Sequence, residues 1–178
     1  MPRGRAPGYD TQREQILARA ADLFARQGYT ATSMNQVALA CGVSKPSLYH
    51  YVRDKYQLLV EIAEDHVGRL KALAAQVQAR PASPEARVRA LITSFLEVYG
   101  ESQAAHRVLT EDVKFLEPAD RKRVLDGQRE VVAAFAEAIA SANAWTTSRW
   151  PSSTLSRSAG SRNFTSSVST RCAARELA

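Results

Sequence analysis

Residues 34–53 read MNQVALACGVSKPSLYHYVR, and their spacing predicts a short helix, a tight turn and a second short helix. Gly42 suits the turn, because glycine adopts left-handed backbone conformations that other residues resist. Ala38 is small where the second helix must cross close to the first. A small core would lock the two helices together through Val37, Val43, Leu48 and Tyr51. This layout is typical of a helix-turn-helix, whose second helix enters the major groove of DNA.

The outward face of the second helix separates this prediction from a simpler one, an ordinary helical hairpin inside a core. A hairpin would explain the apolar spacing. It would not explain a face that is polar, cationic and aromatic, with Lys45, Ser47, Tyr49 and His50. Together with basic flanking charge, this face favours contact with double-stranded DNA.

Charge is distributed unevenly along the chain, whose net charge is +6. Residues 1–56 hold 8 Lys and Arg against 4 Asp and Glu, whereas residues 57–143 hold 11 against 13. A basic first third on a slightly acidic body predicts a nucleic-acid surface at one end. Residues 1–10, MPRGRAPGYD, have no apolar stretch and are predicted to form a basic arm rather than a secretory signal.

Helix start signals recur along the chain and predict an all-α fold. They are the capping boxes at Thr11 and Ser33, the N-cap residues Ser44 and Asp54, and the proline starts at Pro84 and Pro118. No strand-like alternation interrupts the apolar periodicity of helices. The sequence therefore predicts a three-helix head over residues 11–54 and a helical body over residues 55–143.

The sequence changes character at residue 144. Residues 145–178, WTTSRWPSSTLSRSAGSRNFTSSVSTRCAARELA, contain nine Ser, five Thr and five Arg and no sustained apolar period. Such a composition cannot offset the entropy lost on ordering. We predict that residues 144–178 are disordered or aberrant, as a natural tail or as the product of a reading-frame change.

Several classes of protein are disfavoured by composition. The two cysteines, Cys41 and Cys172, are far apart and form no metal-ligand pattern, so we expect a cytoplasmic protein without a metal or cofactor. No apolar run approaches the roughly 18 residues of a membrane span. An enzyme using His106, Glu111 and Asp112 has no nucleophile–base pair or phosphate loop to support it.

Four motifs within residues 13–60 point to a known family. They are an LF…GY…T/S opening, an AxxxGVS turn, an LYxY recognition helix and a DK-xx-LL start of the next helix. In these motifs the chain resembles TetR-family transcriptional regulators closely, and in helix layout more loosely through residue 143. The resemblance implies a cytoplasmic, ligand-responsive transcriptional repressor that binds a palindromic operator as a homodimer, and not an enzyme.

The resemblance also implies the residues that meet DNA. Phosphate contacts fall on Ser33, Lys45, Tyr49, His50 and Lys55, and contacts with base edges fall on Pro46 and Ser47, with Ser44 completing the set. Lys55 and the free amides at the start of its helix would grip one phosphate together. Tyr49 has an alternative role, partial packing in the core.

A small-molecule pocket in the body is implied as well. Its candidate lining residues are Ile62, His66, Ile92, Phe95, Tyr99, Leu109, Val113, Phe115 and Phe135, and the alternative for each is simple core packing. The stretch HRVLTEDVKFLEP, residues 106–118, is similar to regulators of aromatic-acid catabolism. The candidate inducer is therefore an aromatic acid or an acyl-coenzyme A thioester.

Dimerisation is the point at which the sequence departs from the resemblance. TetR-family regulators end in two long apolar helices that pair across a two-fold axis, and no matching stretch follows residue 144. The alternative function is therefore a truncated or frame-shifted product that keeps the DNA-binding head without regulated dimeric function.

Overall fold

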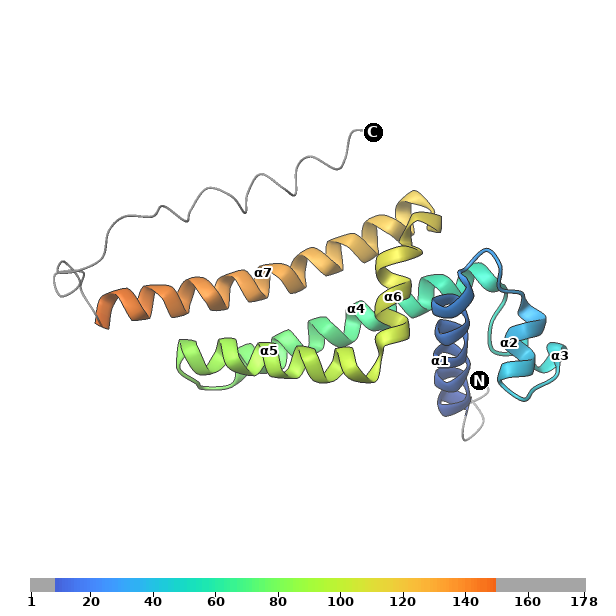
Figure 1. The fold of residues 1–178 in the computed structure, drawn as a ribbon, viewed down its shortest axis with the longest axis horizontal. Helices are drawn as coiled ribbons and strands as arrows, with labels where there is room; N and C mark the ends of the chain where they lie inside the picture. The colour runs from blue at the N-terminus through green and yellow to red at the C-terminus, as the bar shows by residue number, and fades with distance from the viewer. Residues whose placement is uncertain (1–8, 150–178) are drawn as a thin grey trace, which may run out of the picture. The chain divides into compact units, whose positions relative to one another are not determined.

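The computed structural model describes residues 9–149, and every regular element in that range is helical. In chain order these elements are α1 Tyr9–Gln27, α2 Met34–Ala40, α3 Lys45–Leu48, α4 Lys55–Ala79, α5 Pro84–Glu101, α6 Gln103–Glu111, the 3-10 helix η1 Val113–Phe115 and α7 Pro118–Arg149 (Figure 1). No strand occurs in residues 9–149, which confirms the predicted all-α class. None of these helices combines the length and apolar content needed to cross a membrane. The chain divides into two units, residues 1–143 and 144–178, and the predicted head and body both lie in the first unit.

Side-chain caps begin most helices where the sequence predicts. The Ser33 hydroxyl accepts from the Gln36 amide at 3.3 Å, and the Gln36 side chain accepts from the Ser33 amide at 2.8 Å, which is the predicted capping box. Ser44, Asp54 and Ser83 likewise accept from the third residue of the helix that each begins. Because a helix start leaves its first amides without partners, these side chains fix the boundaries locally.

The boundaries of α1 and α3 differ from the prediction. Helix α1 begins at Tyr9, so the capping box predicted at Thr11 lies inside the helix. The Tyr9 ring stacks on the Tyr51 ring with centroids 4.9 Å apart, and this contact supports the first turn of α1. Helix α3 ends at Leu48 instead of reaching Tyr51, and residues 49–51 form turns.

Helix α7 extends a few residues past the predicted boundary near residue 144. The helix continues to Arg149. No glycine or proline occurs from Gln128 to Trp150, so that stretch contains no strong helix breaker. The rest of the predicted tail, residues 150–178, lies outside the described residues, as does the predicted arm up to residue 8.

One hydrophobic core joins the head, α1 to α3, to the body. Its buried members come from α1 to α4, from α6 and from the first turns of α7; the largest are Ile16, Phe24, Leu48, Leu58, Leu59, Leu109 and Val124. Helix α4 is common to the head and the body packing, because it contacts α1 of the head and α5 and α6 of the body. A second, smaller cluster at the far end of α4 contains Ala74, Val77, Leu91, Ala134 and Ala138.

Helix α7 lies against α4 at a glycine, Gly127. A Cβ atom on Gly127 would lie 2.5 Å from Cγ1 of Val67, closer than real carbon atoms approach one another. Ion pairs between Arg123 and Glu64 at 3.0 Å and between Lys71 and Glu130 at 2.6 Å flank this crossing. A side chain at residue 127 would therefore require Val67 or the helices to shift.

Candidate nucleic-acid interface and ligand site

Helices α2 and α3 form the head's helix-turn-helix. Val37 and Leu48 are fully buried between them. Gly42 has a φ of +66°, the left-handed conformation predicted for the turn. The next amide, that of Val43, donates to the Ala38 carbonyl at 3.0 Å. The turn is thus held by backbone hydrogen bonds as well as by the core beneath it.

The predicted DNA-contact residues lie mostly on exposed surface. Lys45, Pro46, Tyr49 and His50 are exposed and Ser47 is half-buried, while Ser33 and Ser44 are exposed at the N-caps of α2 and α3. Tyr49 leaves 44% of its surface exposed, which disfavours the alternative role in the core. Side chains of both phosphate-contacting and base-contacting types are therefore available together on α3 and in the turn after it.

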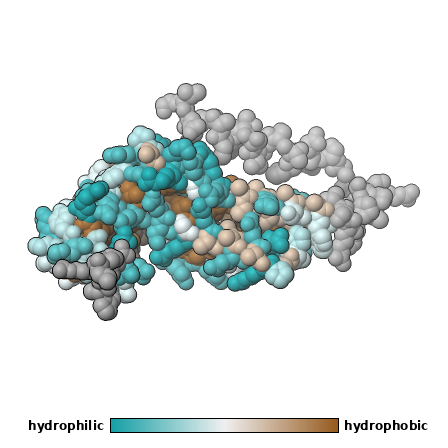
Figure 2. Space-filling view, turned by 180° about the vertical axis from the view of Figure 1, so that it is seen from behind, coloured by the Kyte–Doolittle hydropathy of each residue, from teal (hydrophilic) through white to brown (hydrophobic). Residues whose placement is uncertain are grey.

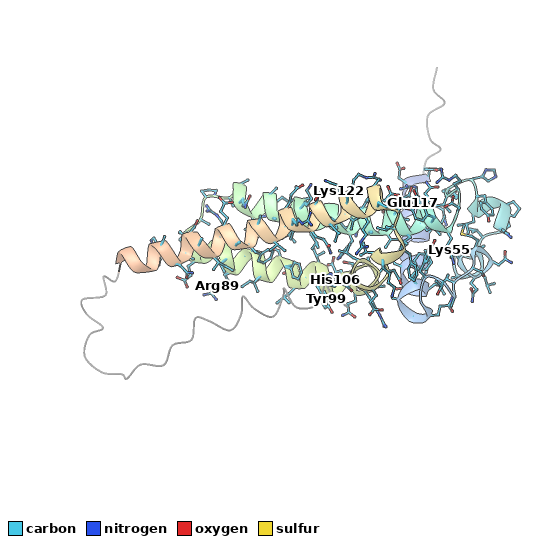
Figure 3. The ribbon with its side chains drawn as sticks, turned by 90° about the horizontal axis from the view of Figure 1, so that it is seen from above. Lys55, Arg89, Tyr99, His106, Glu117 and Lys122 are labelled. Carbon is cyan, nitrogen blue, oxygen red and sulfur yellow. The ribbon has the colours of Figure 1, made fainter. Side chains whose placement is uncertain are left out.

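Lys55 differs from the rest of this set because its ammonium group is already bound within the protein. Its Nζ donates to the carbonyl oxygens of Tyr29 at 2.9 Å, Thr30 at 3.3 Å and Thr32 at 2.9 Å. It also lies 4.5 Å from the centre of the Tyr29 ring. Figure 3 shows Lys55 at the head end of the molecule. Its predicted phosphate contact is untested.

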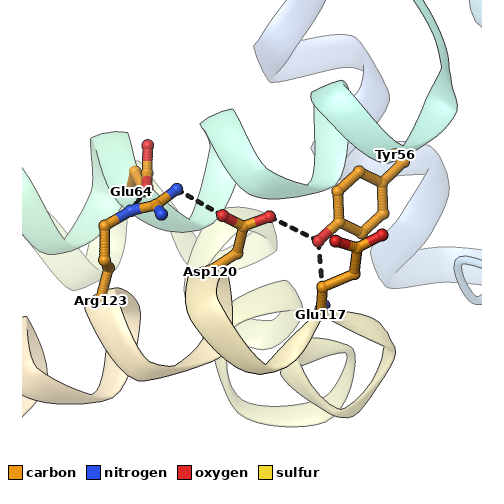
Figure 4. A network of polar contacts seen from close by, with 5 residues as sticks. All are labelled: Tyr56, Glu64, Glu117, Asp120 and Arg123. Carbon is orange, nitrogen blue, oxygen red and sulfur yellow. Dashed lines mark hydrogen bonds and ion pairs between the residues drawn. The ribbon is translucent and has the colours of Figure 1, made fainter.

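A polar network links the start of α4 to the start of α7 (Figure 4). The Tyr56 hydroxyl donates to Asp120 at 2.6 Å and accepts from the Glu117 amide at 2.9 Å, while Arg123 pairs with both Asp120 and Glu64. The hydrogen bond from Tyr56, followed by that from Arg123, lowers the pKa of the Asp120 carboxyl. Sequence reasoning missed this network, because Tyr56 and Asp120 are 64 positions apart and neither belongs to a motif.

The nine predicted pocket residues differ in how deeply the structure buries them. Ile62, His66 and Leu109 are buried, Phe95, Val113 and Phe135 are half-buried, and Ile92, Tyr99 and Phe115 are exposed. Five rings from α4 to α7 gather in one cluster: His66, Phe95, Tyr99, His106 and Phe135. Phe115 instead contacts Tyr29 of the head, with ring centroids 5.3 Å apart.

A directed chain of hydrogen bonds crosses this ring cluster. His66 Nε2 lies 3.2 Å from His106 Nδ1, and His66 Nδ1 lies 3.4 Å from the Ser102 hydroxyl. Ser102 donates its one hydroxyl hydrogen to the Val98 carbonyl at 2.5 Å, so it must accept from His66. His66 is then protonated on Nδ1, and His106 donates to its Nε2. Tyr99 and His106 lie close together in Figure 3, and their ring centroids are 5.0 Å apart.

Both histidines are held neutral. Burial, followed by the nearby His106, lowers the pKa of His66 to about 4, and burial lowers the pKa of His106 as well. The sequence suggested a role for His106 only as part of an enzyme. Glu111, from that same set, forms an ion pair with Arg107 at 3.0 Å.

A cavity of about 530 Å³ opens between α1, α4 and the junction of α5 with α6. Ile62 and His66 are the only predicted pocket residues that line it. Charged side chains also line this cavity: Asp10, Arg13, Glu14, Asp22, Asp65, Arg69 and Glu101. Of the predicted lining residues, Ile62 and His66 line this cavity, and Phe95, Tyr99 and Phe135 join His66 in the ring cluster. The other four, Ile92, Leu109, Val113 and Phe115, belong to neither.

This architecture defines a class: an N-terminal helix-turn-helix head on an all-helical body. Residues 16–62 match the family model "Bacterial regulatory proteins, tetR family", and residues 81–151 match "Tetracyclin repressor-like, C-terminal domain". The chain is 33% identical to a TetR-family transcriptional regulator from Bordetella parapertussis 12822, covers 72% of that protein with 82% of its own length, and superposes with a TM-score of 0.68. The chain belongs to the TetR family.

Further relatives include both an activator and a repressor of transcription. The chain is 29% identical to the transcriptional activator FasR of Mycolicibacterium smegmatis and to the transcriptional repressor KstR2 of Rhodococcus jostii, over 65% and 67% of its length. It is 27% identical to AibR, solved with isovaleryl coenzyme A and operator DNA, over 76% of this chain and 74% of that one, with a TM-score of 0.64. The alignments span 53% of FasR and 59% of KstR2, so the chain corresponds to somewhat more than half of each.

Proposed function

We propose that this chain is a cytoplasmic, ligand-responsive transcriptional repressor that binds a palindromic DNA operator. One observation carries the proposal: the helix-turn-helix presents the exposed Lys45 and Pro46 on α3, and the exposed Tyr49 and His50 in the turn that follows it. Membership in a family of regulatory proteins supports this role over the enzyme considered from His106 and its neighbours.

The proposed DNA contacts fall into two groups. Ser33, Ser44, Lys45, Tyr49 and His50 would hold the phosphate backbone, and Pro46 and Ser47 would lie against base edges. The first group would set the position of α3 in the groove. The second would determine which sequence is preferred.

The proposed inducer is an acyl-coenzyme A thioester, with a free aromatic acid as the alternative. AibR, of similar fold, was solved with isovaleryl coenzyme A, which supports the thioester. The ring cluster around Phe95, Tyr99 and Phe135 offers apolar surface to an acyl or aryl group. Ligand binding would favour a conformation whose head is wrongly placed for the operator.

Repression is proposed rather than activation on the resemblance alone, since the relatives include both an activator and a repressor. A homodimer is proposed because a palindromic operator requires two heads. The alternative, a product that keeps only a working head, gains support from the exposed apolar side chains on α5 and α7.

Salt-dependent binding tests the proposed interface. Duplexes selected by the protein from a random library would be titrated with wild type, Lys45→Met and Ser47→Ala at several salt concentrations. We expect Lys45→Met to reduce the slope of log K against log salt by about one. Ser47→Ala should change base preference and leave the slope unchanged. Failure of the wild type to enrich any duplex would contradict the proposal.

Sedimentation separates the two candidate functions. A stable dimer that binds the selected palindrome tightly would support the regulated repressor. A monomer binding with a Kd on the order of 10⁻⁶ to 10⁻⁴ M would support the head-only alternative.

A further inference from the structure

The turn between α1 and α2 is built around the side chain of Lys55. A lysine ammonium has three N–H donors, and here all three have carbonyl acceptors, those of Tyr29, Thr30 and Thr32. Lys55 is only half-exposed, whereas Lys45 on α3 is exposed. Lys55 at the start of α4 is therefore bound within the protein, whereas the Lys45 side chain on α3 is open to solvent.

The three carbonyls lie outside any helix, and among them only that of Tyr29 has a backbone donor as well, the Thr32 amide at 3.3 Å. They belong to the connection after Gly28, whose φ of +86° turns the chain out of α1. Thr32 is 2% exposed, and its hydroxyl donates to the Gly28 carbonyl at 2.9 Å. Leaving several carbonyls of such a connection without donors would be costly. Lys55 supplies those donors from a point 23 to 26 positions further along the chain.

This connection leads directly into the N-cap of α2, so its position fixes the position of the helix-turn-helix. Ser33, the cap, is the residue after Thr32. The Tyr29 ring lies against Phe24 of α1 and Phe115 of η1, with ring centroids 5.3 Å apart in both cases. The Lys55 ammonium approaches the same ring at 4.5 Å. The ammonium group of Lys55 therefore joins the first residue of α4 to the connection that leads into α2. The Tyr29 ring joins the same connection to η1 of the body.

We propose that Lys55 is a positioning residue, which orients α2 and α3 on α4 and makes no phosphate contact through its ammonium group. This inference rests on the proposed DNA-binding function. It replaces the phosphate role that the resemblance implied for this side chain.

Arginine distinguishes the two roles. A guanidinium binds phosphate at least as well as an ammonium does, because it offers paired donors in one plane. It cannot direct three donors from one compact centre onto three carbonyls. A phosphate contact would therefore survive Lys55→Arg, and a positioning contact would not.

The experiment compares Lys55→Arg and Lys55→Met with Lys45→Met. Each protein is titrated with a duplex selected by the wild type from a random library and with a scrambled duplex of equal length and composition. We expect both Lys55 variants to lose at least about tenfold in affinity for the selected duplex, with the salt slope and the binding to scrambled DNA unchanged. Lys45→Met should weaken binding to both duplexes and reduce the slope by about one.

Hydrogen exchange without DNA supplies an independent readout. Amides of residues 32–37 should exchange faster in both Lys55 variants and at the wild-type rate in Lys45→Met. If the wild type selects no duplex, the proposed function fails while the exchange comparison still tests the contact. The inference is overturned if Lys55→Arg binds as the wild type does, if Lys55→Met lowers the salt slope by one, or if exchange is unchanged. Circular dichroism would confirm folding, and Lys55→Gln replaces Lys55→Met if that variant unfolds.

Discussion

The head and the pair of helices α5 and α7 differ in how completely they bury their apolar side chains. In the head, α1, α2 and α3 together bury Ile16, Phe24, Val37 and Leu48 almost entirely. In α5, a helix of 18 residues, Leu91 alone is buried. Ile92, Leu96 and Tyr99 of α5 and Val132 and Ile139 of α7 are exposed by 41% to 66%.

This difference shows which part of the molecule is self-sufficient. Apart from Leu39, the head's aliphatic residues pack within the described chain, and α2 and α3 are capped by the head's own side chains. Figure 2 shows apolar patches along the body, whereas the head end of the same face is mostly hydrophilic. Exposed apolar patches of this kind are typical of a surface that another helix or molecule covers.

Core truncation should give the largest contrast between the two regions. Leu48→Ala removes a fully buried side chain and should lower the free energy of unfolding by about 3 kcal/mol. Leu96→Ala, the matched control on α5, starts from a side chain that is 60% exposed and should cost under about 1 kcal/mol. Urea unfolding at fixed pH measures both. Equal losses would mean that Leu96 is covered in solution.

Acid should destabilise the body through His66. Its pKa is about 4 in the folded protein against an ordinary 6.5, so the unfolded chain binds more protons between these values. The stability is fully present above pH 6.5 and is lost as the pH falls toward 4. Between pH 7.5 and 5 the loss should be about 2 kcal/mol. Denaturation of wild type and His66→Gln at both pH values isolates this effect, and an identical pH dependence in the two would contradict it.

Removal of one hydroxyl should loosen α7 from α4. Tyr56→Phe deprives Asp120 of a donor and the Glu117 amide of an acceptor. We expect Tm to fall by roughly 2–4 °C. The pKa of Asp120, lowered by this hydrogen bond, should rise toward its ordinary value and can be followed by NMR. An unchanged Asp120 pKa would show that the hydroxyl does not donate to it in solution.

Charge on the exposed face should alter association more than stability. Leu96→Lys combined with Val132→Lys should reduce self-association in sedimentation, with Tm changed by less than about 2 °C. The control is Leu39→Lys on α2, an isolated apolar side chain that is 82% exposed. If the control reduces association equally, net charge rather than the α5 and α7 face is responsible.

The sequence predicted the head well because its determinants are local. The capping box at Ser33, the left-handed turn at Gly42 and the N-caps at Ser44 and Asp54 involve residues at most a few positions apart. The start of α1 was missed because it depends on Tyr51, 42 positions away from Tyr9. For the body, periodicity identified apolar helices but could not separate pocket residues from core residues.

The sequence by itself determined the helical class, the helix-turn-helix and the family resemblance, since spacing and caps operate within one or two helical turns. Only the tertiary structure decided which groups meet across the fold. The Lys55 ammonium donates to carbonyls 23 to 26 positions before it, and His66 is hydrogen-bonded to His106, 40 positions later. Gly127 leaves room for the Val67 side chain of α4. Such contacts depend on how the helices cross, and no local pattern encodes a crossing.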